Sequence, residues 1–125
     1  MHMISLNTSK DVSDLFDRIV AINACICGKS YDDTSNVLSS NSIYSAIGAM
    51  QWYSTASMQA SCLFRSLILN HGFKDGNKRT AVVCASFIQP YTCSEDECIE
   101  CAVQTAQGCL TEVSEICHTL YGGNK

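Results

Sequence analysis

The sequence predicts an all-α fold, a compact helical bundle, and three observations support this prediction. Apolar residues recur at helical spacing through most of the chain, and strand-like patterns are weak outside residues 28–41. The 125 residues, of which 46% are hydrophobic and 16% charged, suit one globular core. We therefore expect a single domain over residues 1–125, with residues 1–3 as a candidate cloning scar.

The first predicted helix covers residues 11–27, whose apolar residues form one amphipathic stripe. Thr8 or Ser9 is available as its N-cap, and Gly28 is a typical stop. Residues 28–41 are polar and show little periodicity, so we expect a non-helical connection there.

Two helices are expected to follow this connection. Asn41 or Ser42 is a suitable cap for a short one, and Gly48 is expected to loosen the chain near its end. The longer one occupies residues 55–70, where the apolar residues again follow helical spacing, and Thr55 is a suitable cap.

The C-terminal third predicts three further helical stretches. Residues 81–88 are apolar almost all round, which is typical of a buried helix, and Pro90 ends that helix. Ser94 and Glu97 then have the spacing of a capping box. An apolar stripe continues to the end of the chain, with a break or kink at Gly108, so these helices are expected to close the bundle.

Chemistry is concentrated in residues 70–81, Asn-His-Gly-Phe-Lys-Asp-Gly-Asn-Lys-Arg-Thr-Ala, between two predicted helices. Histidine is the residue type whose ordinary pKa lies near neutral pH, so His71 is suited to take a proton from a hydroxyl. Phe73 is interpreted as an apolar anchor of the loop. Asp75 offers the oxygen ligand that Mg²⁺ prefers when it bridges phosphate oxygens. The stretch thus predicts a catalytic loop.

The start of the second helix is suited to phosphate. Its first backbone N–H groups have no intrahelical partner and carry the positive end of the helix dipole. Gly76 allows close approach or a positive φ, and Asn77 is expected to cap the helix through its side chain. Lys78 and Arg79 supply positive charge. His, Gly, Asp and Asn also occur between helices simply as caps and turn formers, but the presence of the whole ordered set favours a catalytic or binding site.

The ordered set from His71 to Arg79 resembles the signature loop of the Fic/Doc family, His-x-Phe-x-Asp/Glu-Gly/Ala-Asn-Gly/Lys-Arg-x-x-Arg. The resemblance implies a Fic fold whose active loop lies between two central helices. It also implies an enzyme that transfers a phosphate-containing group from ATP, with Mg²⁺, to a protein. In that role His71 is the general base, Asp75 holds the metal, and the phosphates bind Gly76, Asn77, Lys78 and Arg79.

Two departures from the adenylyltransferase pattern point to the Doc (death-on-curing) branch. Lys78 replaces a glycine, and Val82 replaces a second arginine. In that branch ATP is understood to bind reversed, so the resemblance implies a protein kinase that transfers the γ-phosphate to a Ser/Thr hydroxyl of a translation factor such as elongation factor Tu. A Fic-type adenylyltransferase, which transfers AMP, is the alternative. A catalytically idle binding module of the same fold is the second alternative.

The resemblance also bears on regulation and target binding. Residues 111–115 share five positions with the inhibitory helix of Fic proteins, but Ile116 replaces the final small or amide residue, so we expect a separately encoded antitoxin, as in toxin–antitoxin systems. Residues 28–41 occupy the place where the family often forms a short β-flap that aligns the target peptide. An ordinary surface loop is the alternative interpretation.

Charge and hydropathy exclude several classes of protein. The net charge of −4 argues against a general nucleic-acid or membrane-surface partner, because those partners attract basic faces. Neither a signal peptide nor a membrane span is evident, so we expect a cytoplasmic protein.

Nine cysteines are many for such a protein. Their odd number and their place in apolar helical runs favour small buried hydrophobes over disulfides. This interpretation covers Cys84, Cys101, Cys109 and Cys117. Zinc bound by Cys93, Cys98, Cys101 and His118 is the weaker alternative, because these ligands do not form two short pairs.

Overall fold

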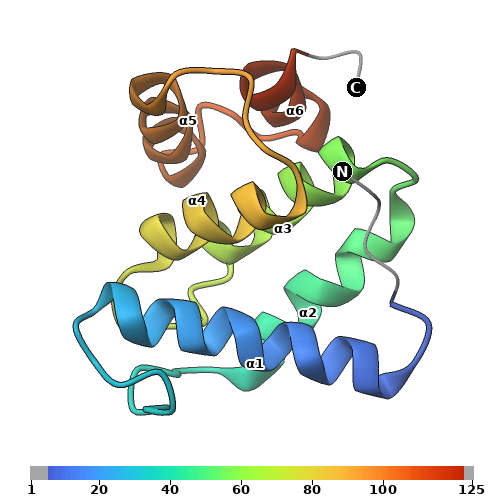
Figure 1. The fold of residues 1–125 in the computed structure, drawn as a ribbon. Helices are drawn as coiled ribbons and strands as arrows, with labels where there is room; N and C mark the ends of the chain where they lie inside the picture. Colours follow the sequence, from blue (N-terminus) through green and yellow to red (C-terminus); the bar gives the residue numbers. More distant parts are fainter. Residues whose placement is uncertain (1–5, 123–125) are drawn as a thin grey trace.

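The structure is a computed structural model and describes residues 6–122, so the candidate cloning scar at residues 1–3 lies outside the described residues. Within that range the chain is all-α and contains no β-strand, which confirms the predicted fold class (Figure 1). The elements are α1 (Ser9–Ile26), α2 (Ser40–Ala49), the short 3-10 helix η1 (Met50–Trp52), α3 (Ala56–Leu69), α4 (Asn77–Ile88), α5 (Glu95–Ala106) and α6 (Val113–Tyr121).

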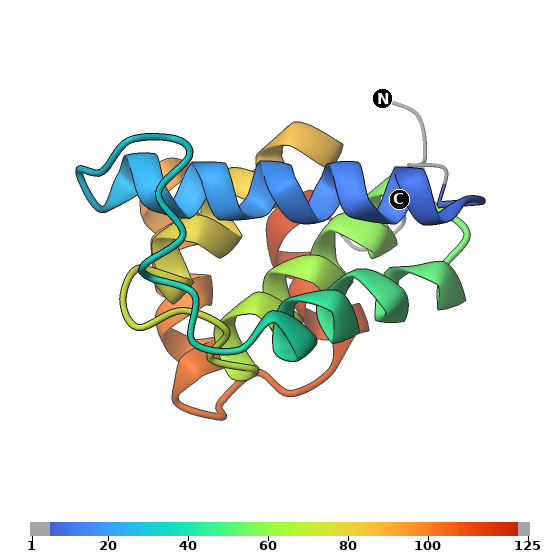
Figure 2. The ribbon, with the colours of Figure 1, turned by 90° about the horizontal axis from the view of Figure 1, so that it is seen from below.

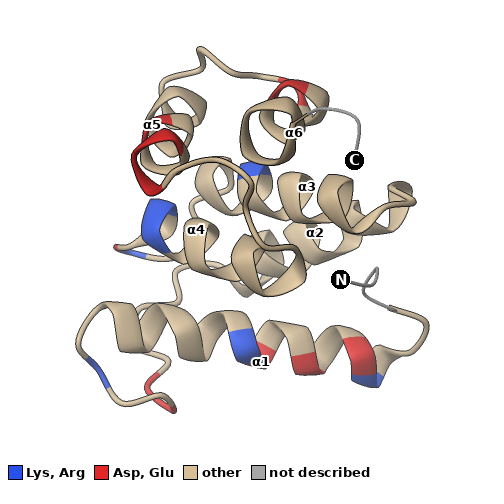
Figure 3. Ribbon diagram, turned by 45° about the horizontal axis from the view of Figure 1, so that its top comes forward, with Lys and Arg blue, Asp and Glu red and all other residues tan. Residues whose placement is uncertain are grey.

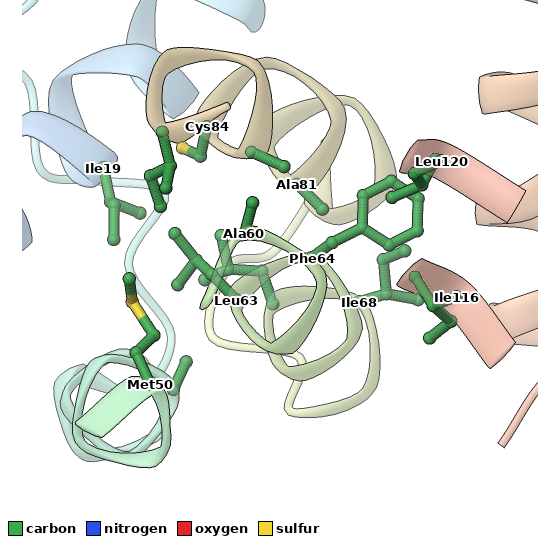
Figure 4. Packing of buried hydrophobic residues seen from close by; sticks show 14 of the residues in the cluster. Ile19, Met50, Ala60, Leu63, Phe64, Ile68, Ala81, Cys84, Ile116 and Leu120 are labelled. Atoms are coloured by element: carbon green, nitrogen blue, oxygen red, sulfur yellow. The ribbon is translucent and has the colours of Figure 1, made fainter. Parts of the chain in front are cut away.

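Helix α3 forms the centre of the bundle. Eleven of its fourteen residues are buried, and it packs against α2, α4, α5 and α6. Figure 4 shows Leu63 pointing toward Met50 and Ile19 on one side, while Phe64 and Ile68 lie near α6 on the other. The core therefore continues through α3 from α1 and α2 to the C-terminal helices.

Most of the predicted helix ends are confirmed. Thr8 caps α1 in a capping box with Asp11, and Ser94 caps α5 in the same way with Glu97. Thr55 caps α3 through a side-chain bond to the N–H of Met58. In each case the hydroxyl oxygen of the capping residue accepts a hydrogen bond from a backbone N–H group that has no acceptor within the helix.

Helix α2 differs from its prediction at both ends. Its cap is Ser39, whose Oγ accepts from the N–H of Ser42, so the expected caps at Asn41 and Ser42 are wrong. Gly48 does not loosen the chain, because the helix continues to Ala49 and then tightens into η1. The glycine is tolerated in the last turn of a helix that packs against α3 and α1.

The connection between α1 and α2 does not form the expected β-flap. The N–H groups of Asp33 and Val37 donate to Ser30 and Thr34, and these turns interrupt any extended pairing. An isolated antiparallel bridge joins Val37 to Phe73. Figure 2 shows this segment passing beside the loop between α3 and α4, so it is a surface connection that borders that loop.

All nine cysteines are free, and five of them are buried: Cys62, Cys84, Cys98, Cys101 and Cys117. Cys109 is exposed in the turn after α5, so its predicted burial is wrong. No group of His, Cys, Asp and Glu in residues 6–122 is arranged to hold a metal ion, which argues against the zinc alternative. Burial raises the pKa of the Cys84 and Cys101 thiols to about 12.

In the part of the chain that the structure describes, none of the helices combines the length and the apolar character that crossing a bilayer requires.

Thiol reactivity tests this arrangement of cysteines. We expect Cys25 and Cys109 to react first with Ellman's reagent in the native protein, because both are exposed. Cys84 should react on the order of a thousandfold more slowly, since only the thiolate attacks and its pKa is about 12 instead of 9.0. Absorbance gives the rates, and mass spectrometry assigns the sites. Rapid labelling of native Cys84 would contradict its burial in the core.

Candidate active site

The loop between α3 and α4 begins with an unusual backbone conformation. The side chain of Asn70 donates to the carbonyl oxygen of Ser42 at 3.1 Å, and this bond fixes the end of α3. His71 then takes a φ of +51°, the only positive value at a non-glycine residue among the described residues. Its side chain is exposed. The backbone of His71 is thus in the left-handed region, and the imidazole is open to solvent.

Gly72 is held closely against α2. A Cβ at this position would lie 2.6 Å from Cγ1 of Ile43, so only glycine fits without movement of the Ile43 side chain. The carbonyl oxygen of Gly72 accepts from the N–H groups of Leu38 and Ser39 at 2.8 and 3.1 Å. The residue after His71 is therefore fixed by the start of α2.

Phe73 and Asn77 close the loop on itself. Phe73 is 2% exposed and belongs to the hydrophobic core. The side chain of Asn77 accepts from the Phe73 N–H at 3.2 Å and donates to the Phe73 carbonyl oxygen at 2.9 Å. Gly76, with φ +79°, occupies the N-cap position of α4 and makes no side-chain cap. The predicted helix cap by the side chain of Asn77 is therefore wrong, because that side chain ties the loop instead.

A buried asparagine pair lies beneath the loop. Asn23 of α1 is 1% exposed, and its amide nitrogen donates to the carbonyl oxygen of Asp75 at 2.9 Å and to Oγ1 of Thr80 at 3.0 Å. Its amide oxygen accepts from Nδ2 of Asn36 at 3.1 Å. These residues were missed by the sequence analysis. A signal was present, because position 23 falls on the apolar stripe of the first helix, where an amide needs a buried partner.

The charged residues of the loop remain accessible. Asp75 accepts from the Gly76 N–H at 2.8 Å, and its second oxygen lies 3.9 Å from Nη2 of Arg79. Both side chains are mostly exposed, so this pair contributes little to stability. Lys78 is also exposed. An exposed carboxylate beside a helix N-terminus suits the oxygen coordination of Mg²⁺, and Asp75 is the residue of the loop able to hold it.

An apolar groove of about 510 Å³ begins at Lys78 and Arg79. Its volume is in the range of sites for small molecules. Glu95 also borders it, and Figure 3 shows the acidic first turn of α5 near the basic start of α4. The remaining walls come from α1, α4 and α5 and are aliphatic: Ile26, Val82, Val83, Ile99, Ala102 and Val103.

The structure therefore brings the predicted site residues together: His71, Phe73, Asp75 and Gly76 lie in the short connection between α3 and α4, and Asn77, Lys78 and Arg79 form the first turn of α4. The Fic/DOC family model matches residues 15–89, more than half of the chain. The chain belongs to the Fic/DOC family. No curated protein and no solved structure matches it. The family match extends from α1 to the end of α4, so it includes the loop and Asn23, and it indicates a transferase of the Fic type.

Two glycines with similar backbone angles test how the Fic/DOC loop is packed. Gly28 and Gly76 have φ values of +75° and +79°, but only at Gly76 would a Cβ meet neighbours, 3.0 Å from Sγ of Cys27 and 3.2 Å from Nδ2 of Asn23. We expect Gly28→Ala to lower the free energy of unfolding by about 1 kcal/mol through its backbone alone. Gly76→Ala should lower it by at least about 1 kcal/mol more. Urea denaturation measures both, and equal losses would show that the loop is not packed on α1.

Proposed function

We propose that this Fic/DOC chain is a Doc-like toxin of a toxin–antitoxin system. It transfers the γ-phosphate of ATP to a Ser or Thr hydroxyl of a protein target, a translation factor such as elongation factor Tu. The observation that carries the proposal is the loop that presents the exposed side chains of His71 and Asp75 and leads into the N-terminus of α4. There Lys78 stands at the position that distinguishes the Doc branch. A protein that acts on the translation machinery works in the cytoplasm, which is its proposed location.

The proposed phosphate site is the first turn of α4. The first intrahelical bond joins the N–H of Thr80 to the carbonyl oxygen of Gly76, so the N–H groups of residues 77–79 precede it and have no acceptor within the helix. Lys78 and Arg79 add two exposed cations. Positioned N–H groups and cations are what phosphoryl transfer requires, because negative charge spreads over the phosphate oxygens.

His71 is the proposed general base. It precedes the phosphate-binding residues in the same loop, and its exposed imidazole is open to a hydroxyl of the target. Asp75 is the proposed ligand of Mg²⁺, which neutralises phosphate charge when bound. The groove beside Lys78 and Arg79 is the proposed place for the rest of the nucleotide, since its aliphatic walls suit the face of a base.

Two observations bear on the alternatives. An adenylyltransferase would share the loop, but Lys78 and Val82 stand where that branch has glycine and arginine. An idle binding module has no need of an exposed base and exposed cations at an open helix N-terminus. A separately encoded antitoxin remains the proposed partner that restrains the kinase, by covering the loop.

Isotope labelling of the nucleotide tests the reaction. The protein is incubated with Mg²⁺ and a bacterial lysate, once with ATP labelled on the γ-phosphate and once with ATP labelled on the α-phosphate. We expect label in protein only from the γ position. His71→Ala should lower the rate at least about a hundredfold, because a general base typically contributes that much.

His118→Ala is the matched control, since His118 is exposed on α6 and lies outside the loop. This variant should keep the wild-type rate. Transfer from the α position would identify an adenylyltransferase instead. Absence of label in both incubations would favour the idle binding module or another donor.

Lys78 is expected to decide which phosphate is presented. Replacing it with glycine removes a cation from the site and restores the residue of the adenylyltransferase pattern. We expect Lys78→Gly to lower γ-phosphate transfer about a hundredfold, the usual cost of losing one charge-stabilising group. Lys74→Gly, which removes another exposed cation of the loop, is the control. An unchanged γ-transfer rate in Lys78→Gly would remove this residue from the mechanism.

A further inference from the structure

The buried asparagine pair has a consequence for one peptide group of the loop. The carbonyl oxygen of Asp75 points into the protein and meets Nδ2 of Asn23 at 2.9 Å and Nδ2 of Asn36 at 3.5 Å. The thiol of Cys27 lies 3.8 Å from the same oxygen. In a trans peptide the C=O and N–H bonds point in opposite directions. The N–H of Gly76 therefore points outward, where it donates to the side chain of Asp75.

Nothing in the local backbone alone fixes this orientation. Glycine takes positive and negative φ at similar cost, so the peptide before Gly76 is able to rotate. A rotated peptide would turn the Asp75 oxygen outward, toward the proposed phosphate site, and would direct the N–H inward. An anion would then meet an acceptor in place of a donor. The orientation needs partners outside the loop.

Asn23 and Asn36 approach from two different segments. Asn23 belongs to α1 and is fixed by its bonds to Thr80 and Asn36, so its donor atom has little freedom. Asn36 belongs to the connection between α1 and α2, and its own carbonyl oxygen accepts from the N–H of Lys74 at 2.8 Å. The Asp75 oxygen is thus held by a helix on one side and by the bordering segment on the other.

We infer that Asn23, supported by Asn36, is a positioning residue for phosphate binding. It holds the Asp75–Gly76 peptide with the Asp75 carbonyl oxygen turned away from the proposed phosphate site, so that no acceptor faces the anion beside the N–H groups of residues 77–79, while the Gly76 N–H points outward and bonds the side chain of Asp75. Asn23 itself does not touch the ligand. The inference rests on the proposed function only in taking phosphate as the ligand of this helix end.

The test compares Asn23→Asp with the wild-type protein. Aspartate has the size of asparagine but no amide donor, so the Asp75 oxygen loses its closest partner and meets a carboxylate. We expect the dissociation constant for inorganic tripolyphosphate, measured by calorimetry, to rise at least tenfold. The amide resonance of Gly76 should shift in nitrogen-15 spectra of the free protein. If the KM for ATP rises more than kcat falls, the effect lies in binding.

Thr105→Val is the control for loss of a buried polar group. Thr105 is fully buried in α5 and donates to the carbonyl oxygen of Cys101, away from the loop. This variant should lose stability but keep the tripolyphosphate affinity within twofold. If Asn23→Asp fails to fold, Asn36→Ser takes its place, because that change removes the second donor to Asp75 at the edge of the network.

The outcomes separate this inference from the proposed reaction. Unchanged tripolyphosphate affinity and an unchanged Gly76 resonance in Asn23→Asp, or in Asn36→Ser, would overturn the inference. Failure of the wild-type protein to bind tripolyphosphate would overturn it as well. Wild-type protein that binds tripolyphosphate and shows the expected variant effects, yet transfers no label from ATP, would contradict the proposed kinase and leave the inference standing.

Discussion

The burial of α3 on nearly every side is the constraint on which the rest of the structure depends. Each large side chain removed from water contributes roughly 1.5–3 kcal/mol, and Leu63, Phe64 and Ile68 are all at most 1% exposed. Because neighbours hold the helix from opposite sides, its C-terminal end has a fixed position. The loop that follows starts from that fixed point. A rigid base under a short connection is what gives an exposed histidine a reproducible location.

The interior around this helix is not purely apolar. Ser57, Ser61 and Ser66 are buried in α3, and Ser61 donates to the carbonyl oxygen of Ser57 within the same helix. The asparagine pair beneath the loop is buried as well, and no buried side-chain nitrogen or oxygen in residues 6–122 lacks a partner. Fully satisfied polar groups specify one arrangement of the core, because any shift would leave one of them without a hydrogen bond.

Sequence reasoning succeeded where the signal is local and failed where the partner is distant. Caps such as Thr8, Thr55 and Ser94 were predictable, because each bonds a residue three positions away. The role of Asn77 was not predictable, since the same side chain is able to cap a helix or to bond the backbone of Phe73 within the loop. Asn23 donates hydrogen bonds to Asp75 and Thr80, more than fifty residues away, and the periodicity of the sequence does not reveal such distant partners. The turns in residues 28–39 likewise replaced the flap that resemblance alone suggested.

The mutual bonds of Phe73 and Asn77 make the loop a self-tied unit. Its most demanding geometry comes from two residues of the motif and from the core beneath them, with little reliance on side chains at the surface. Such a unit is portable: the surrounding helices are able to diverge widely in sequence while the loop keeps its shape. A substitution on the outer face of a surrounding helix should therefore leave the shape of the loop intact.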